Sequence, residues 1–203
     1  MSEVAAILLA AGSASRYRAA GGETTKLVAE FRGRPLARVA AEAASGSRAK
    51  PLVVVTGFAR ESVEAALDGI PARFAHNANF ASGLASSLKA GVAALPDAAS
   101  GALILLADMP RVTPEILDRL IAEFAARPDA LAVIPTYRGE RGNPVLLARA
   151  LFAEVATLRG DEGARRVLKR MEPSRVVEVA FDAAGVALDV DTPGDLAAAA
   201  EAP

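Results

Sequence analysis

Short apolar runs alternate with amphipathic segments along most of the chain. The apolar runs are residues 4–10, 52–56 and 102–107. Each has the length and the aliphatic content of a buried central strand. The segments in which apolar residues recur at helical spacing are residues 36–44, 60–67, 86–95 and 114–126. Thr113 as an N-cap and Pro114 at the first helical position mark the start of the last of these helices. The alternation predicts right-handed crossovers and an open, mainly parallel α/β sheet with helices on both faces.

The remaining segments continue this pattern less regularly. Further strands, some of them antiparallel at an edge, are predicted for residues 132–135, 144–147, 175–179 and 186–190. Two stretches rich in Ala, Gly and Ser, residues 40–47 and 98–101, are expected to be loops. Near the end of the chain, Thr192 and Asp195 have the spacing of a capping box, with Asp in place of the usual Glu. A helix is therefore predicted from this point through residue 202.

Composition narrows the class of protein. Hydrophobic residues make up 52% of the chain but aromatic residues only 4%, so the core must consist of Ala, Val, Leu and Ile. No linker or repeat interrupts the sequence, and residues 1–203 are expected to form a single domain. The absence of cysteine excludes disulfides, thiolate metal sites and a cysteine nucleophile.

Charge and hydropathy give expectations about partners and location. The formal net charge is −1, which provides no global electrostatic reason to bind nucleic acid or an anionic membrane. The chain enters its first predicted strand at Val4 without a basic region before it, and no stretch approaches the roughly 18 apolar residues that span a bilayer. We therefore expect a soluble, cytoplasmic protein without nucleic-acid or membrane partners.

The loop after the first strand is a candidate phosphate site. Its sequence, LAAGSASR over residues 9–16, is rich in small residues that leave backbone N–H groups accessible to phosphate oxygens. Arg16, and Lys26 ten residues later, could supply positive charge to a triphosphate and to a leaving pyrophosphate. An ordinary turn with two solvated cations explains this segment equally well. The glycine patterns of dehydrogenases and P-loop NTPases are missing, which argues against both classes.

Aspartates at two strand ends are candidate metal ligands. Asp108 follows a predicted strand, so its carboxylate should lie at the carboxyl edge of the sheet, where ligands bind in folds of this kind. Asp189 and Asp191 lie on the same side of the chain if that segment is extended. Carboxylates without cysteine and with a single histidine favour Mg²⁺, or Mn²⁺. Asp108 could instead be a turn residue, and Asp191 could simply favour a helix dipole.

Together, these segments resemble the MobA-like NTP transferase family, most closely its molybdenum cofactor cytidylyltransferases. The resemblance rests on LAAGSxSR with a following lysine, LLADMP at residues 105–110, and DVDTPxDL at residues 189–196. Further matches are GLASSL at residues 83–88, RGNP at residues 141–144 and GDEGAR at residues 160–165. One departure is the interval between Arg16 and Lys26, which is usually shorter in the family.

The resemblance implies a nucleotide-diphospho-sugar transferase fold and a Mg²⁺-dependent transfer of CMP to the phosphate of a molybdopterin-type cofactor, with release of pyrophosphate. The family associates the Ala-Ala-Gly form of the first loop with CTP and the Ala-Gly-Gly form with GTP. A molybdoenzyme or a maturation factor could be a protein partner. Alternatives are another NTP, a sugar or alcohol phosphate as acceptor, or a chaperone that carries the molybdenum cofactor without catalysis.

The family also implies roles for individual residues. The implied catalytic residues are Arg16, Lys26 and Asp108. The implied nucleotide-binding residues are these three with Leu9, Ala10, Ala11, Gly12, Gly83, Ser86 and Ser87. The expected metal ligands are Asp108, Asp189 and Asp191. The implied acceptor-binding residues are Arg141, Gly142, Asn143, Asp161, Gly163 and Arg165.

Overall fold

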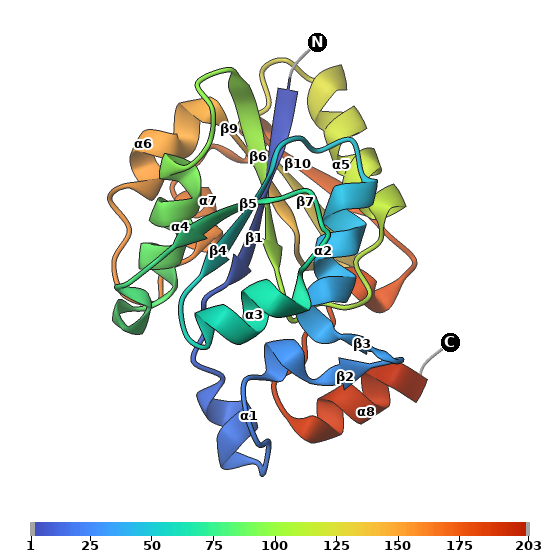
Figure 1. Ribbon diagram of the computed structural model, residues 1–203. Coiled ribbons are helices and arrows are strands. Elements are labelled where there is room, and N and C mark those ends of the chain that lie inside the picture. Colours follow the sequence, from blue (N-terminus) through green and yellow to red (C-terminus); the bar gives the residue numbers. More distant parts are fainter. Residues whose placement is uncertain (1–2, 202–203) are drawn as a thin grey trace.

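A computed structural model describes residues 3–201, and its centre is an eight-stranded sheet (Figure 1). The strands are β1 (Glu3–Ala10), β4 (Leu52–Thr56), β5 (Arg73–His76), β6 (Ala99–Leu106), β7 (Ala132–Tyr137), β8 (Glu140–Arg141), β9 (Val145–Ala148) and β10 (Val176–Ala180). Their order is β10-β7-β9-β6-β1-β4-β5, with β8 beside β7. The pairs β1–β4, β1–β6, β4–β5 and β7–β10 are parallel, whereas β9 runs antiparallel to both of its neighbours. The mainly parallel α/β sheet predicted from the sequence is thus confirmed.

Helices cover both faces of this sheet (Figure 1). One face carries α2 (Leu36–Gly46), α3 (Arg60–Ala66) and α5 (Pro114–Ala126), and the other carries α4 (Leu84–Ala93), α6 (Phe152–Val155) and α7 (Ala164–Leu168). Alternate residues of β1 face the two layers, so that Leu8 packs in the cluster of Leu117 whereas Ile7 packs in that of Leu88. Because both faces are covered, β1 is buried from Val4 to Ala10, which explains its unbroken apolar sequence.

A smaller layer lies beyond the carboxyl ends of the central strands. It contains α1 (Ser15–Ala19), the hairpin of β2 (Glu30–Phe31) and β3 (Arg34–Pro35), and the last helix, α8 (Pro193–Glu201) (Figure 1). Phe31 and Ala199 share a small apolar cluster, and the Arg32 side chain donates to the carbonyl of Ala200 at 2.9 Å. The last helix is therefore held against a segment from the first fifth of the chain.

Short 3-10 turns complete the description. They are η1 (Lys26–Val28), η2 (Phe80–Ser82), η3 (Arg149–Leu151), η4 (Pro173–Arg175) and η5 (Ala184–Val186). No helix among residues 3–201 is both long enough and apolar enough to cross a membrane.

Most of the predicted elements are confirmed. The strand at residues 52–56 and the helix at 114–126 have their predicted bounds, and the Thr113 side chain accepts from the backbone N–H of Ile116 at 3.5 Å. At the start of α8, Asp195 accepts from the N–H of Thr192 at 2.8 Å and Thr192 accepts from the N–H of Asp195 at 3.1 Å. The predicted capping box is thus present, although residue 202 lies outside the described range.

Four predictions were wrong. Residues 40–47 are not a loop, because α2 continues to Gly46 and buries four of its alanines from Ala40 to Ala44. Residues 98–101 are largely strand, since β6 begins at Ala99. Residues 186–190 form no strand, because Val186 ends the turn η5 and the residues after it are irregular. The antiparallel strand β9 lies inside the sheet, between β6 and β7, whereas antiparallel strands were expected at an edge.

Candidate active site

The site lies where the central strands β1 and β6 end side by side. Leu9 is in register with Leu106, and the N–H of Ala107 donates to the carbonyl of Leu9 at 3.2 Å. The loop that follows β1 and the Asp108 that follows β6 therefore lie next to each other at the carboxyl edge of the sheet. This is the edge at which open α/β sheets bind ligands.

The loop after β1 leaves its backbone open to a cavity. A Cβ at Gly12 would meet no atom within 4 Å, and the loop turns into α1 through Ala14 at a φ of 51°. Ala11 is 3% exposed and lines the cavity, whereas Ala10 is wholly buried in the sheet. Small residues keep this loop close to the space in front of it, so backbone N–H groups could reach a bound anion.

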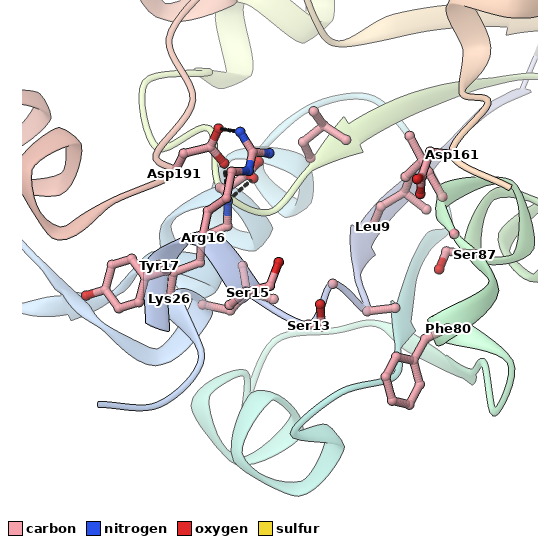
Figure 2. A pocket seen from close by; sticks show the side chains of 18 of the residues that line it. Leu9, Ser13, Ser15, Arg16, Tyr17, Lys26, Phe80, Ser87, Asp161 and Asp191 are labelled. Carbon is pink, nitrogen blue, oxygen red and sulfur yellow. Dashed lines mark hydrogen bonds and ion pairs between the residues drawn. The ribbon is translucent and has the colours of Figure 1, made fainter. Parts of the chain in front are cut away.

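Two cations and two carboxylates form a cluster beside this loop (Figure 2). The Lys26 ammonium lies 2.7 Å from Asp108 Oδ2 and 3.0 Å from Asp191 Oδ1, and it donates to the carbonyl of Val190 at 2.6 Å. Arg16 pairs with the other oxygen of Asp191. The side chains of Lys26 and Asp108 are 12% and 19% exposed, whereas that of Arg16 is 76% exposed. Lys26 is thus fixed between the carboxylates and Arg16 closes the cluster from the solvent side.

Local backbone contacts bring these residues together. The N–H of Val190 donates to the carbonyl of Asp108 at 3.0 Å, which places the next residue, Asp191, beside Asp108. Lys26 begins the turn η1, whose cap Thr25 accepts from the N–H of Leu27 at 3.4 Å. Because the contact between Val190 and Asp108 joins residues more than 80 positions apart, no local sequence pattern could reveal it.

The electrostatics of the cluster keep Lys26 protonated. Burial by itself would lower the pKa of this lysine, but the charge of Asp108 and the hydrogen bonds to Asp108 and Asp191 outweigh it, and the pKa is raised above its ordinary value. The ammonium therefore carries a full positive charge at neutral pH in the place where a phosphate or a metal ion would meet the carboxylates.

The carboxylates offer a partial metal site. Asp108 Oδ1 is buried and has no hydrogen-bond partner, so this oxygen is free to coordinate a cation. Asp191 lines the cavity, but Asp189 is exposed and does not line it, so the two do not act from the same side. Among the described residues, no three acidic or histidine side chains gather into one group. A Mg²⁺ ion typically needs only one or two carboxylates when phosphate oxygens and water complete its shell, and Asp108 with Asp191 fits that donor set.

The cavity has a volume of about 350 Å³ and two chemically different ends (Figure 2). Arg16, Lys26 and Asp191 form the charged end. Leu9, Phe80, Ser87 and Asp161 lie at the other end, which is mainly apolar with one hydroxyl and one carboxylate. Phe80 and Tyr17 were not predicted as site residues. The only available signal for Phe80 was a bulky aromatic within an otherwise polar segment.

The mainly apolar end of the cavity is built by the start of α4 and by the loop around residue 160. Gly83 has a φ of 104°, and a Cβ there would lie 2.3 Å from the carbonyl atoms of Gly160, so only glycine fits. The N–H of Ala85 also donates to the carbonyl of Gly160 at 2.9 Å. Gly83 and Ser87 line the cavity, but Ser86 points away from it and donates to the carbonyl of Gly83 at 2.8 Å.

The six predicted acceptor-binding residues are divided between several places. Arg141, Gly142 and Arg165 line a second cavity of about 360 Å³, in which Arg141 pairs with Glu178 at 2.7 Å. Asp161 lines the first cavity instead. Asn143 donates its N–H to the carbonyl of Val186 at 2.8 Å, and a Cβ at Gly163 would meet Leu84 at 2.9 Å. These two positions line neither cavity and serve local packing.

Comparison with known families and proteins gives consistent matches over most of the chain. The family described as "MobA-like NTP transferase domain" matches residues 6–176. The nicotine blue oxidoreductase of Paenarthrobacter nicotinovorans is 30% identical over 194 residues, which cover 93% of this chain and 92% of that protein.

Solved structures share the whole fold. Rv0371c of Mycobacterium tuberculosis H37Rv superposes with a TM-score of 0.85 at 26% identity, covering 99% of both chains. A structure of Rv0371C in complex with manganese gives a TM-score of 0.79 at 27% identity, covering 100% of both chains. A nucleotidyl transferase from Methanothermobacter thermautotroptrophicus has a TM-score of 0.83 at 24% identity, covering 98% of this chain and 96% of that one, a likeness of fold.

Proposed function

The chain belongs to the MobA-like NTP transferase family and is a nucleotidyltransferase, and we propose that it transfers CMP from CTP to the phosphate of a molybdopterin-type acceptor. The observation that carries this proposal is the cluster in which Lys26 bridges Asp108 and Asp191 beside the open loop after β1. A triphosphate needs both fixed positive charge and accessible backbone N–H groups, and this corner of the fold offers the two together.

The triphosphate is proposed to occupy the charged end of the cavity. There the loop from Leu9 to Gly12 would supply backbone contacts, and Lys26 would neutralise phosphate oxygens. Arg16 would leave Asp191 for the nucleotide, because its guanidinium is mostly exposed and only its contact with Asp191 has to be exchanged. Gly83 and Ser87 would then face the nucleoside, with Ser86 supporting the backbone behind them.

Asp108 and Asp191 are the residues that would hold Mg²⁺ or Mn²⁺. The unpartnered Oδ1 of Asp108 and the manganese complex of a relative that is 27% identical over its whole length both support this assignment. The exposed Asp189 is a weaker candidate for the same role. A bound divalent ion supplies charge neutralisation to phosphate oxygens and to the departing pyrophosphate.

The reaction needs no side-chain nucleophile. A phosphate oxygen of the acceptor attacks the α-phosphorus of the nucleotide, the bond between the α-phosphorus and its bridging oxygen breaks, and pyrophosphate leaves with the electron pair. Lys26 and Arg16 act by holding the reacting groups and by stabilising charge that grows on the leaving group. The acceptor's anionic groups are proposed to bind near Arg141 and Arg165, which line the second cavity together with Gly142, while Asn143 and Gly163 support the backbone around it.

The choice of CTP rests on the first loop. Ala11 is packed tightly, since a Cβ added at Gly57 would lie 2.8 Å from the Ala11 methyl group. The methyl group therefore cannot move back from the cavity, and a pyrimidine needs less room there than a purine.

The test is transfer of labelled phosphate. With CTP labelled at the α-phosphate, molybdopterin and Mg²⁺, label should appear in the acceptor, whereas label at the γ-phosphate should appear in pyrophosphate. Transfer to a sugar or alcohol phosphate instead would change the acceptor class, and binding of the cofactor without pyrophosphate release would indicate a carrier. Because one full-length relative carries the name of an oxidoreductase, reduced nicotinamide nucleotides belong in the same panel. A molybdoenzyme that receives the product is the proposed protein partner.

A further inference from the structure

A buried asparagine behind the mainly apolar end of the cavity forms hydrogen bonds with two serine hydroxyls. Asn77 is 6% exposed and follows the edge strand β5. Its Oδ1 accepts from the backbone N–H of Asn79 at 3.0 Å, and its Nδ2 donates to Ser86 Oγ at 2.8 Å and to Ser87 Oγ at 3.0 Å. No transfer role assigned above uses this side chain.

These contacts fix which way each hydrogen bond points. A backbone N–H can only donate, so the side-chain atom that faces Asn79 must be the oxygen, and the two protons of Nδ2 must face the serines. Both serine hydroxyls therefore act as acceptors toward Asn77. Ser86 gives its own proton to the carbonyl of Asn79 or of Gly83, at 3.0 and 2.8 Å.

Ser87 is left with a proton to donate. Within residues 3–201, its hydroxyl forms no hydrogen bond besides the one that it accepts from Asn77. The residue is 5% exposed, and the open space that it touches is the cavity itself. The Ser87 hydroxyl therefore donates its proton into the cavity, because the hydrogen bond from Asn77 occupies its other side.

A carboxylate lies at the same end. Figure 2 shows Asp161 and Ser87 on the side of Leu9, away from the charged cluster. A Cβ added at Gly83 would lie only 2.8 Å from the backbone nitrogen of Asp161, so the backbone of Asp161 packs closely against the start of α4. An ionised carboxylate only accepts hydrogen bonds, so this end of the cavity offers one donor and one acceptor.

We infer that Asn77 is a positioning residue that makes Ser87 a hydrogen-bond donor, and that Ser87 and Asp161 together read the edge of a nucleobase in which a ring acceptor adjoins an amino group. The inference rests on the proposed nucleotide-binding role of this cavity. Cytosine has this edge, with N3 accepting from Ser87 and the 4-amino group donating to Asp161. Adenine shares the pattern but is larger, whereas uracil and guanine present a ring N–H beside a carbonyl, which is the opposite pattern.

Inverting the pattern tests the inference. Asn77→Asp keeps the acceptor for Asn79 but takes protons from the serines, so Ser87 would turn its lone pairs toward the cavity. The Asp161→Asn exchange adds a donor at the second position. The measurement is the ratio of kcat/KM for CTP to that for UTP, together with dissociation constants from calorimetry. Asn79→Asp is the matched control, because it adds the same charge two positions away without touching the hydroxyl of Ser87.

We expect the CTP to UTP ratio to fall at least about tenfold in Asn77→Asp, and further in the double variant, because each reversed hydrogen bond leaves a mismatched group. Asn79→Asp should keep the wild-type ratio. An unchanged ratio in Asn77→Asp, or an equal fall in the control, overturns the inference.

Binding by the wild-type protein provides a second test that needs no variant to fold. In 3-deaza-CTP a C–H group replaces N3, so we expect it to bind at least about tenfold more weakly than CTP, and Ser87→Ala should remove that difference. If the wild type binds CTP and 3-deaza-CTP equally well, Ser87 does not donate a hydrogen bond to N3 of the base, and the inference is refuted. If CTP binds with this preference but no pyrophosphate forms, the inference stands and the proposed function fails. If no nucleotide binds, both fail.

Discussion

Replacing Lys26 by Met removes the charge that joins the two carboxylates of the site. Methionine keeps most of the aliphatic length of the side chain but cannot donate to Asp108, Asp191 or Val190. Asp108 then has no cation at its Oδ2, and Asp191 keeps only Arg16. The two neighbouring carboxylates then share a single positive charge, that of Arg16, and repel each other.

The cost can be worked out from burial. Breaking a buried ion pair by removing one partner typically costs about 3–5 kcal/mol of unfolding free energy. Asp108 and Asp191 are 19% and 23% exposed, so water relieves part of this cost, and we expect a loss of roughly 2–3 kcal/mol. For a chain of this size that corresponds to a Tm lower by roughly 4–12 °C.

The pH dependence has a definite sign. The pKa of Lys26 is raised above its ordinary value of 10.5, so its stabilising effect is complete below that pH and is lost as the pH rises through the raised value. The difference in Tm between wild type and Lys26→Met should therefore be constant around neutral pH and should close only in strongly alkaline solution.

Thermal unfolding with and without Mn²⁺ provides the assay. Without the ammonium, Asp108 Oδ2 and Asp191 Oδ1 become available, so Mn²⁺ should raise the Tm of Lys26→Met more than that of the wild type, although the variant transfers nucleotide slowly. The matched control is Lys89→Met on α4, which lies outside the cluster and should change stability by less than about 0.5 kcal/mol.

Two results would refute this reasoning. If Lys26→Met is as stable as the wild type at neutral pH, the ammonium does not hold the carboxylates together. If Mn²⁺ stabilises both proteins equally, the Lys26 ammonium does not compete with the metal ion for the two carboxylates.

Three further variants test the other parts of the site. Asp108→Asn should keep the fold but lower turnover at least about a hundredfold even at saturating Mg²⁺, because the amide cannot neutralise the cation; retained activity would remove Asp108 from the site. Arg16→Ala should leave the Tm nearly unchanged, since the guanidinium is 76% exposed, while it weakens NTP binding and slows transfer. Unchanged affinity and rate would mean that the first loop is only a turn. Ala11→Gly should lower the preference for CTP over GTP in competing turnover, and an unchanged ratio would contradict the steric explanation.

The sequence predicted those parts of the fold that depend on local pattern. The bounds of the strand at residues 52–56 were predicted correctly because a β-branched run is a local signal. The bounds of the helix at residues 114–126 were predicted correctly because Thr-Pro at a helix start is one as well. The loop predicted for residues 40–47 was wrong because alanine, which packs inside α2 here, is equally common in loops. The edge strand β5 was not predicted, since its residues are largely exposed and show no apolar run.

The site was only partly accessible from the sequence. Asp108 could be placed because the end of an apolar strand fixes its position at the sheet edge. The choice between Asp189 and Asp191 could not be made, because it depends on the hydrogen bond from Val190 to Asp108, which joins distant segments. The positioning role of Asn77 could not be predicted, since an asparagine in a polar loop looks the same in the sequence whether its amide contacts a ligand or a neighbouring side chain.

The ion pair between Lys26 and Asp191 spans 165 residues, which sets an order of events during synthesis. A ribosome that adds about 5–20 residues per second needs roughly 8–33 s to travel from one partner to the other. Throughout that interval the nascent chain can form the strands β1, β4 and β6, yet it lacks the carboxylate that completes the cluster. A chain that ends before residue 191 could form much of the sheet and the pair between Lys26 and Asp108, but not the two ion pairs of Asp191. The complete charge cluster can therefore form only after translation has passed Asp191.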